Sequence, residues 1–531
     1  MDRKALLERL KGESFDLLVI GGGASGAGVA LDAATRGLKV ALVERLDFSE
    51  GTSSRSTKLI HGGVRYLEIA VKTFDRTQLN LVRDALHERA LLLKLAPHLT
   101  RPLWLLTPLY GLWEVPYYWT GLKLYDLLAG NARLALSRYL SPQETLRRFP
   151  AVRSEGLVGA VAYQDGQFDD ARYNLEIILT ALEEGAVAVN YAEVTGLLKT
   201  DGKLAGAVVR DRLGGWEFEV GAKVVVNATG PFSDSIRRLD DPAAPELVRA
   251  SSGVHIILDK KYSPPDTGLL IPHTEDGRVV FVLPWLGQTL VGTTDHPAEP
   301  TPHPQAREEE IAYILRQVEP YLGQIAREEV RAAWSGLRPL VARAQAADTA
   351  KLARDHLVEE SPSGLLTLTG GKWTTYRKMA LDCVNYAVRR FGLPAGPSRT
   401  HERRLVGGQG FDPNGAERLG QEYGLEPDIA QHLHRSYGSR ANQVAEIGQT
   451  FRLAPGYPYI ESEVVYAVRR ELAQTPLDVL ARRTRLAFLD TRAAEAALPE
   501  VAKRMAKELG WKAETRKARE SEAQERLTVA I

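Results

Sequence analysis

Cysteine is nearly absent from the chain, which has only Cys383 in 531 residues. A disulfide within the chain is therefore impossible, and zinc or iron–sulfur sites that need several thiolates are excluded. The 11 histidines are scattered, and none has the paired spacing of a zinc site. We predict no metal centre and interpret Cys383 as a packed, small hydrophobic side chain.

Excess charge and long apolar runs are also missing. The chain has 68 Lys and Arg against 67 Asp and Glu, which argues against a dedicated nucleic-acid binder, because such proteins usually have a basic excess. The start of the chain is charged and shows no secretory signal. The longest nearly uncharged stretch, residues 102–122, is interrupted by Pro108, Glu114 and Pro116, whereas a transmembrane helix needs about 20 consecutive apolar residues. The composition is that of an ordinary globular intracellular protein of roughly two to four domains.

Glycine, in contrast, forms a pattern near the start. An apolar strand, a glycine-rich turn, a helix of small residues and a second apolar strand follow one another at residues 15–20, 21–26, 27–36 and 39–43. In this G-x-G-x-x-G turn, Gly21 allows the tight turn, Gly23 lets the backbone approach a pyrophosphate, and Gly26 lets helix and strand pack closely. The helix N-terminus offers N–H groups to the phosphates. Glu44, which ends the second strand, is placed to bind an adenosine ribose, so we predict a dinucleotide site.

Two later segments, residues 223–230 and 364–371, repeat the pattern of an apolar strand followed by a glycine turn. Three such turns fit an open α/β sheet, in which ligands bind at the carboxyl ends of the strands. The stretch 51–66 is dense in glycine, hydroxyl and basic residues. This favours FAD over NAD, because an NAD domain would normally continue with another βαβ unit.

The predicted fold is α/β, with a Rossmann-like FAD-binding domain, an inserted antiparallel-sheet substrate or cap domain, and an all-helical C-terminal domain. The FAD-binding domain is assigned residues 14–90, 155–235 and 330–391, and the cap domain residues 91–154 and 236–329. Residues 392–415, rich in proline and glycine, are a predicted linker, and residues 416–531 form the helical domain. The last assignment depends on apolar residues at helical spacing in 464–490 and 501–527.

Eight motifs in sequence order resemble those of the FAD-dependent, aerobic glycerol-3-phosphate dehydrogenases, within the wider D-amino-acid-oxidase-like flavoproteins. They lie at residues 19–28, 52–66, 226–231, 253–255, 281–285, 291–295, 335–340 and 370–378. The most specific are TKLIHGGVRY at residues 57–66 and GGK at residues 370–372. The resemblance implies oxidation of sn-glycerol 3-phosphate to dihydroxyacetone phosphate, with transfer of a hydride from C2 to N5 of a non-covalently bound FAD.

The substrate implied by the resemblance needs cations for its phosphate and a base for its hydroxyl proton. Candidate phosphate-binding residues are Arg65, Tyr66 and Arg354. His255, in an apolar strand, is the candidate base, and a neighbouring cationic residue is the alternative assignment. Arg338 and Lys372 are candidates to stabilise developing negative charge.

The candidate cofactor contacts come from the glycine turns and the stretch after Glu44. They are Gly21, Gly23, Ala24, Ser25, Gly26, Glu44, Thr52, Ser53, Ser54, Thr57, Lys58, Leu59, His61, Gly62, Gly63, Val194, Gly230, Gly371 and Thr374.

The electron acceptor implied by the resemblance is a membrane quinone, or oxygen in the related oxidases; no obvious inserted block is present in the cap region, which favours quinone. A quinone user must reach the bilayer. Two stretches are candidates: the aromatic residues 102–122, and a basic helical stretch with Arg469, Arg470, Arg482, Arg483 and Arg485. A cap-domain core and a solvated helix face are their alternative interpretations. We predict a homodimer in the cytoplasm, peripherally attached to an anionic membrane surface at the inner face of the cell membrane.

Two other functions remain open from the sequence. An amino-acid or amine oxidase of the same fold would need only a carboxylate clamp. A non-catalytic flavoprotein or nucleotide-binding subunit would bind cofactor, and substrate would not bleach it.

Overall fold

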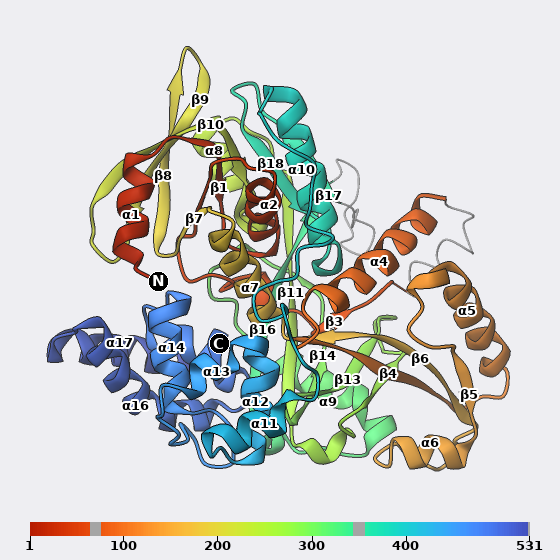
Figure 1. The fold of residues 1–531 in the computed structure, drawn as a ribbon. Helices are drawn as coiled ribbons and strands as arrows, with labels where there is room; N and C mark the ends of the chain where they lie inside the picture. Colours follow the sequence, from red (N-terminus) through yellow and green to blue (C-terminus); the bar gives the residue numbers. More distant parts are fainter. Residues whose placement is uncertain (64–75, 343–355, 529–531) are drawn as a thin grey trace.

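The computed structural model describes residues 1–63, 76–342 and 356–528, and shows two sheets with a helical C-terminal part beside them (Figure 1). The first sheet is built around β1 (Phe15–Ile20), the strand that leads into the glycine turn. Its order is β17 (His356–Glu360), β18 (Leu366–Gly370), β10 (Glu217–Asn227), β1, β2 (Val40–Val43) and β7 (Val187–Val189). The strands from β18 to β7 are parallel, and β17 pairs antiparallel with β18. The hairpin of β8 (Ala192–Thr200) and β9 (Lys203–Asp211) joins β10. The predicted α/β class is confirmed.

Both faces of this sheet are covered, which explains why β1 is apolar almost throughout. Leu17 and Val19 pack with α2 (Ala24–Thr35), α7 (Asp170–Glu183) and α10 (Tyr376–Phe391). Leu18 and Ile20 point to the opposite face and pack with α1 (Arg3–Gly12) and the β8–β9 hairpin. The alternation follows from the two-residue period of a strand.

The second sheet has ten strands. Its main order is β15 (His296–Pro297), β11 (Val248–Leu258), β14 (Gln288–Gly292), β13 (Val280–Trp285), β12 (Thr267–Ile271), β4 (Thr100–Leu109), β6 (Gly159–Phe168) and β3 (Leu59–Ile60). β16 (Ala332–Val341) pairs with β11, and β5 (Arg138–Leu140) with β6. The helices α4 (Arg76–Leu95), α5 (Glu114–Ala129), α6 (Pro142–Arg148) and α9 (Glu308–Leu322) accompany it (Figure 1).

Two details of this sheet differ from the predicted cap domain. β12 and β4 are parallel, so the sheet is mixed rather than purely antiparallel. β6 and β16 form hydrogen bonds within this sheet, although residues 155–235 and 330–391 were assigned to the FAD-binding domain. Pairing partners far away in sequence decide to which sheet an apolar strand belongs, and periodicity does not reveal them. The remaining domain boundaries stay a prediction.

The C-terminal part is helical, as predicted. It contains α11 (Gly415–Tyr423), α12 (Pro427–Tyr437), α13 (Ala441–Ala445), α14 (Glu461–Glu471), a π-helical turn (Asp478–Arg483), α15 (Leu486–Leu489), α16 (Thr491–Leu509) and α17 (Ala513–Thr528). No helix or strand lies between Phe391 and Gly415, the predicted linker, all of which the structure describes. Figure 1 shows the helical part below α7; its π-helical turn contacts α7, and its helix α15 contacts β16.

The basic stretch predicted to face a membrane is instead largely internal. Arg482, Arg483 and Arg485 are buried, and each pairs with a carboxylate of the N-terminal half of the chain. Arg469 lies at the surface and pairs with Glu508. Both the membrane-facing interpretation and the solvated-face alternative are therefore wrong for the three buried arginines. Within the described parts of the chain, no helix is both long and apolar enough to cross a membrane.

Candidate active site

The glycine turn between β1 and α2 forms the floor of the candidate site. The N–H of Gly21 donates to the carbonyl of Val43, 2.8 Å away, and Gly21 has a φ of 110°, which favours glycine. A Cβ on Gly26 would overlap the carbonyl oxygen of Gly21. Gly23 is the N-cap of α2 without a side-chain cap, so the positive end of this helix is available to a bound anion.

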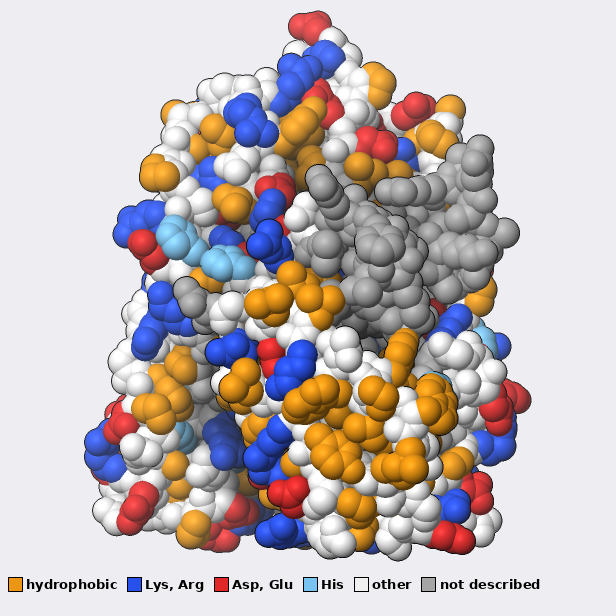
Figure 2. Space-filling view, turned by 90° about the vertical axis from the view of Figure 1, so that its right-hand side faces the viewer, with side chains coloured by type: hydrophobic (Ala, Val, Ile, Leu, Met, Phe, Trp, Pro, Cys, Tyr) orange, Lys and Arg blue, Asp and Glu red, His pale blue; other side chains and the backbone are white. Residues whose placement is uncertain are grey.

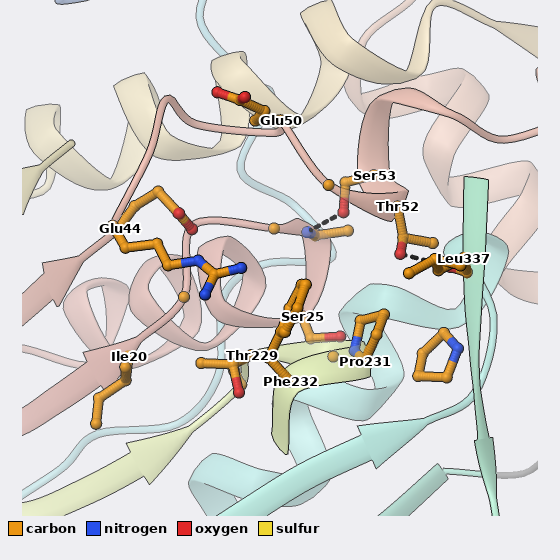
Figure 3. Close-up of a pocket in the computed structure, with 18 of the residues that line it drawn as sticks. Ile20, Ser25, Glu44, Glu50, Thr52, Ser53, Thr229, Pro231, Phe232 and Leu337 are labelled. Carbon is orange, nitrogen blue, oxygen red and sulfur yellow. Dashed lines mark hydrogen bonds between the residues drawn. The ribbon is translucent and has the colours of Figure 1, made fainter. Parts of the chain in front are cut away.

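A cavity of about 350 Å³ lies at the carboxyl ends of the parallel strands. Figure 3 shows its labelled residues converging from β1, the start of α2, the loop after β2, the turn after β10, and β16. Eleven predicted site residues line it: Gly21, Gly23, Ala24, Ser25, Glu44, Thr52, Ser53, Val194, Gly230, Gly371 and Lys372. Three glycine turns that are far apart in the sequence thus meet at one cavity, as the open-sheet prediction required.

Glu44 holds two sides of this cavity together. Its carboxylate accepts hydrogen bonds from the backbone N–H groups of Gly22, at 2.7 Å, and Leu46, at 2.9 Å. Burial raises the pKa of Glu44, and the two amide bonds oppose that rise. Since each carboxylate oxygen has two acceptor sites, the side chain can still accept a bond from a ribose hydroxyl.

Residues 45–58, here called the cofactor loop, close the cavity from the other side. The hydroxyl of Ser53 accepts a hydrogen bond from the N–H of Ala24 at 2.8 Å, and that of Thr52 donates to the carbonyl of Leu337 at 2.6 Å, as Figure 3 shows. Leu337 belongs to β16, so the loop joins the two sheets. The indole N–H of Trp373 donates to the carbonyl of Ser53 at 2.9 Å.

The three predicted catalytic residues lie in two places. Lys372 lines the cavity just before α10. His255 and Arg338 lie on the paired strands β11 and β16 and are not among the residues that line the cavity. Arg338 alternates along β16 with Leu337 and Pro339, which do line it, and therefore points to the other face.

His255 is buried and its ring stacks on Trp334, with ring centroids 4.3 Å apart. Its Nε2 lies 2.9 Å from the hydroxyl oxygen of Thr57, and its Nδ1 has no hydrogen-bond partner in the described structure. Burial, followed by the charges of Lys58 and Arg338, lowers the pKa of His255 well below its usual value. The imidazole is therefore neutral near pH 7, which is the form that can accept a proton, although the lowered pKa makes it a weaker base than an exposed imidazole. Arg338 pairs with Asp295 at 3.1 Å.

Lys58, a predicted cofactor contact, is not among the residues that line the cavity. Its ammonium is fully buried, 2.7 Å from both Asp170 and the carbonyl of Ser54, and 4.5 Å from the centroid of the Trp334 ring. Burial lowers its pKa to about 7. Other predicted contacts are likewise not among the cavity-lining residues: Gly26, Ser54, Thr57, Leu59, His61, Gly62, Gly63 and Thr374. Gly26 nevertheless packs directly against the backbone of the glycine turn, at the carbonyl of Gly21. The N–H of Gly62 donates to the hydroxyl of Tyr125 at 3.0 Å.

The predicted phosphate-binding residues Arg65, Tyr66 and Arg354 lie outside the described residues. Their assignment stays a prediction.

Several lining residues were not predicted. Arg55 is buried in the cofactor loop, where burial lowers its pKa to about 9, and it donates to the carbonyl of Ser335 at 2.9 Å. Arg45 stacks over the ring of Phe232, 4.1 Å from its centroid. Arg55 lies within the recognised motif 52–66 and Arg45 directly follows Glu44, so sequence proximity could have found them. Thr301, from a loop before α9, carries no such signal.

The residues present fit a flavin dinucleotide. The glycine turn leaves room for a pyrophosphate, α2 directs its N-terminus toward it, and Glu44 offers acceptors for a ribose. The described residues contain no cluster of three or more His, Cys, Asp or Glu side chains that could hold a metal ion.

Comparisons with known proteins agree with this geometry. A protein-family model described as FAD dependent oxidoreductase matches residues 16–377, and one described as the C-terminal domain of alpha-glycerophosphate oxidase matches residues 398–516. The mitochondrial glycerol-3-phosphate dehydrogenase of Homo sapiens is 52% identical over 528 residues, covering 96% of this chain and 72% of the human protein. That of Arabidopsis thaliana is 47% identical, covering 97% of this chain and 87% of its own.

Among solved structures, the glycerol-3-phosphate dehydrogenase of Bacillus halodurans, complexed with FAD, superposes with a TM-score of 0.81 at 31% identity. The match covers 99% of this chain and 97% of the bacterial one. Similarity of this extent spans both sheets and the helical part, and FAD is the cofactor it assigns. The chain therefore belongs to the family of FAD-dependent glycerol-3-phosphate dehydrogenases.

Proposed function

We propose that the protein oxidises sn-glycerol 3-phosphate to dihydroxyacetone phosphate and passes the electrons to a membrane quinone. The observation that carries the proposal is that similarity to glycerol-3-phosphate dehydrogenases extends over 96% of the chain, including the helical part, while the cavity has the features of an FAD site. Bound FAD supplies the hydride acceptor, and the protein supplies placement and electrostatics.

The proposed residues act on three parts of the substrate: the C2 hydroxyl proton, the hydroxyl oxygen and the phosphate. The neutral imidazole of His255 takes the proton from the C2 hydroxyl as the hydride leaves C2, and the hydroxyl of Thr57 orients the ring. The positive charge of Arg338, which also acts on the His255 imidazole, stabilises the negative charge that develops on the substrate oxygen, and Lys372 adds positive charge from the cavity side. Arg65, Tyr66 and Arg354 hold the phosphate. Substitution of His255 by Gln should lower kcat strongly and leave FAD bound.

The proposed membrane contact is the exposed apolar surface of α5 and the residues just before it. Leu112, Trp113 and Leu127 are 79%, 70% and 74% exposed. Figure 2, which faces the side of the molecule where α5 lies, shows hydrophobic side chains gathered there, with Lys and Arg around them. Exposed aromatic and aliphatic side chains beside cations suit the surface of an anionic bilayer at the inner face of the cell membrane. We propose that this surface, named the α5 patch, gives access to quinone.

Liposome flotation tests the α5 patch. Trp113→Glu should reduce binding to anionic vesicles at low salt, whereas Phe451→Glu, equally exposed at 77% but in the C-terminal part, should not. Equal flotation of both variants and the wild type would contradict the assignment of the α5 patch as the membrane contact.

The acceptor is tested with glycerol 3-phosphate and a short-chain quinone analogue. Quinone reduction should exceed oxygen uptake; hydrogen peroxide as the main product would favour the oxygen-using oxidase. The predicted homodimer is tested by sedimentation of the purified protein.

A further inference from the structure

Three arginines of the C-terminal part form hydrogen bonds with the cofactor loop. Arg482, Arg483 and Arg485, here called the arginine brace, lie in and just after the π-helical turn. Arg482 and Arg483 both donate to Asp47 in the cofactor loop, Arg483 with two bonds of 2.6 and 3.0 Å. The three side chains that form these bonds are buried, so the loss of either partner would leave an uncompensated buried charge.

Arg485 holds the opposite end of the same loop. One of its guanidinium nitrogens donates to the carbonyl of Ser54 at 2.8 Å and to Asp170 at 3.2 Å. Asp170 in turn accepts bonds from the N–H and hydroxyl of Ser56, at 3.0 and 2.7 Å, and from Lys58. Thr57, between the last two, contacts His255. The C-terminal part is thus linked through Asp170 to the candidate base.

At this junction between the C-terminal part and the cofactor loop, the carboxylates of Asp47 and Glu50 are held in their ionised forms. Although burial disfavours the carboxylate of Asp47, the charges of Arg483 and Arg482 outweigh it and lower the pKa to about 2. Glu50, which lines the cavity, is likewise held at a pKa of about 2 by Arg482 and by Arg526 of α17. Arg526 contacts Glu50 at 2.8 Å.

The backbone gives an independent sign that the junction is tightly constrained. Seven described residues other than glycine have a positive φ, and two of them, Asp201 and Leu286, lie in hairpin turns. The other five, Ser49, Lys58, Tyr191, Leu472 and Arg485, lie at this junction. Such conformations cost free energy and persist only where surrounding contacts fix them, typically at functional sites.

We propose that the C-terminal helical part is a component of the FAD site. The arginine brace fixes the cofactor loop in the conformation that lines the cavity, so Arg482, Arg483 and Arg485 are positioning residues for FAD. By thermodynamic reciprocity, FAD binding then also strengthens the docking of the C-terminal helices. The proposal depends on FAD binding and not on the substrate or the electron acceptor.

The competing explanation is that buried ion pairs hold the two halves of the chain together in general. Arg172 separates the two explanations. It is as buried as the brace and crosses the same junction to Glu471 at 2.8 Å, yet it forms no hydrogen bond or ion pair with the cofactor loop. Arg172→Lys is therefore the matched control for Arg482→Lys and Arg485→Lys. Lys keeps the charge and loses the planar fork that contacts two groups at once.

The experiment measures FAD affinity by fluorescence titration of the FAD-depleted full-length variants, together with their thermal unfolding. Arg482→Lys and Arg485→Lys should each raise the FAD Kd at least tenfold, and Arg172→Lys less than threefold, with similar unfolding temperatures in the absence of FAD. Wild-type affinity in both brace variants, or an equal loss in the Arg172 variant, would overturn the proposal.

A second measurement needs no variant to fold. Hydrogen–deuterium exchange of the wild-type holoenzyme and of the same protein stripped of FAD should show faster exchange without FAD in residues 478–489 as well as 45–58. Faster exchange in the cofactor loop alone would contradict the coupling, even if glycerol 3-phosphate proved not to be the substrate.

Discussion

Replacing Glu44 by Gln should weaken FAD binding, because one end of the new side chain has the wrong polarity. The carboxylate accepts from two backbone N–H groups, those of Gly22 and Leu46, at 2.7 and 2.9 Å. A glutamine can satisfy only one of them with its oxygen, and its NH₂ group must face the other N–H. A buried donor left without an acceptor costs about 1–3 kcal/mol. Borne by the cofactor site, that cost raises the FAD Kd by about 5- to 140-fold, since about 1.4 kcal/mol is a factor of ten.

The assay is fluorescence titration of FAD-depleted protein. Glu193→Gln is the control, because Glu193 lines the same cavity but pairs with Arg212 at the surface, at 3.2 Å. The control should bind FAD within twofold of the wild type. FAD binding by Glu44→Gln within twofold of the wild type, or an equal loss of affinity in the control, would contradict a role of Glu44 in FAD binding.

Three further predictions concern the turn, the cations and the buried carboxylates. Gly26→Ala should abolish retention of FAD through gel filtration, because its Cβ would overlap backbone, whereas Gly121→Ala, with open space around it, should retain FAD. Lys372→Ala and Arg338→Ala should each lower kcat/KM at least tenfold while the flavin is retained; wild-type rates in both would contradict their roles. The pKa of Asp47 falls to about 2 on folding, so its charge stabilises the protein above pH ~4 and this contribution, about 2 kcal/mol, is lost as the pH falls toward 2. In urea titrations the stability difference between wild type and Asp47→Asn should therefore shrink between pH 5 and pH 3, and a constant difference would contradict this.

The nucleotide-binding part was predictable because its signals are local. Strand Phe15–Ile20 has the predicted bounds, and helix α2 begins only three residues before the predicted start. Gly21, Gly23 and Glu44 line the cavity because a βαβ unit brings them together within about 25 residues of chain.

The predictions that failed depended on distant partners. A run such as Arg482, Arg483 and Arg485 is typical of a solvated or membrane-facing helix, and only the fold brings Asp47 and Asp170 against it from more than 300 positions away. The environment of Lys58 was likewise not visible in the sequence, because the fold buries this side chain against Asp170, 112 positions away; its cofactor contact stays a prediction. Tertiary pairing outweighs the local preference of a charged side chain for water in each case.

The helical C-terminal part shows how a correct class prediction can leave a role unassigned. Helical periodicity identified α14, α16 and α17 in outline. It gave no indication that Arg526 of α17 would contact Glu50 of the cofactor loop. Contacts of this kind are visible only once the two halves of the chain are placed together.

The most direct test of the account is the visible spectrum of the purified protein before and after anaerobic addition of sn-glycerol 3-phosphate. We expect a flavin spectrum that bleaches with this compound and does not bleach with D-amino acids. A flavin spectrum unchanged by glycerol 3-phosphate would contradict the proposed reaction, and a protein that neither contains nor rebinds FAD would contradict the assignment of the cavity itself.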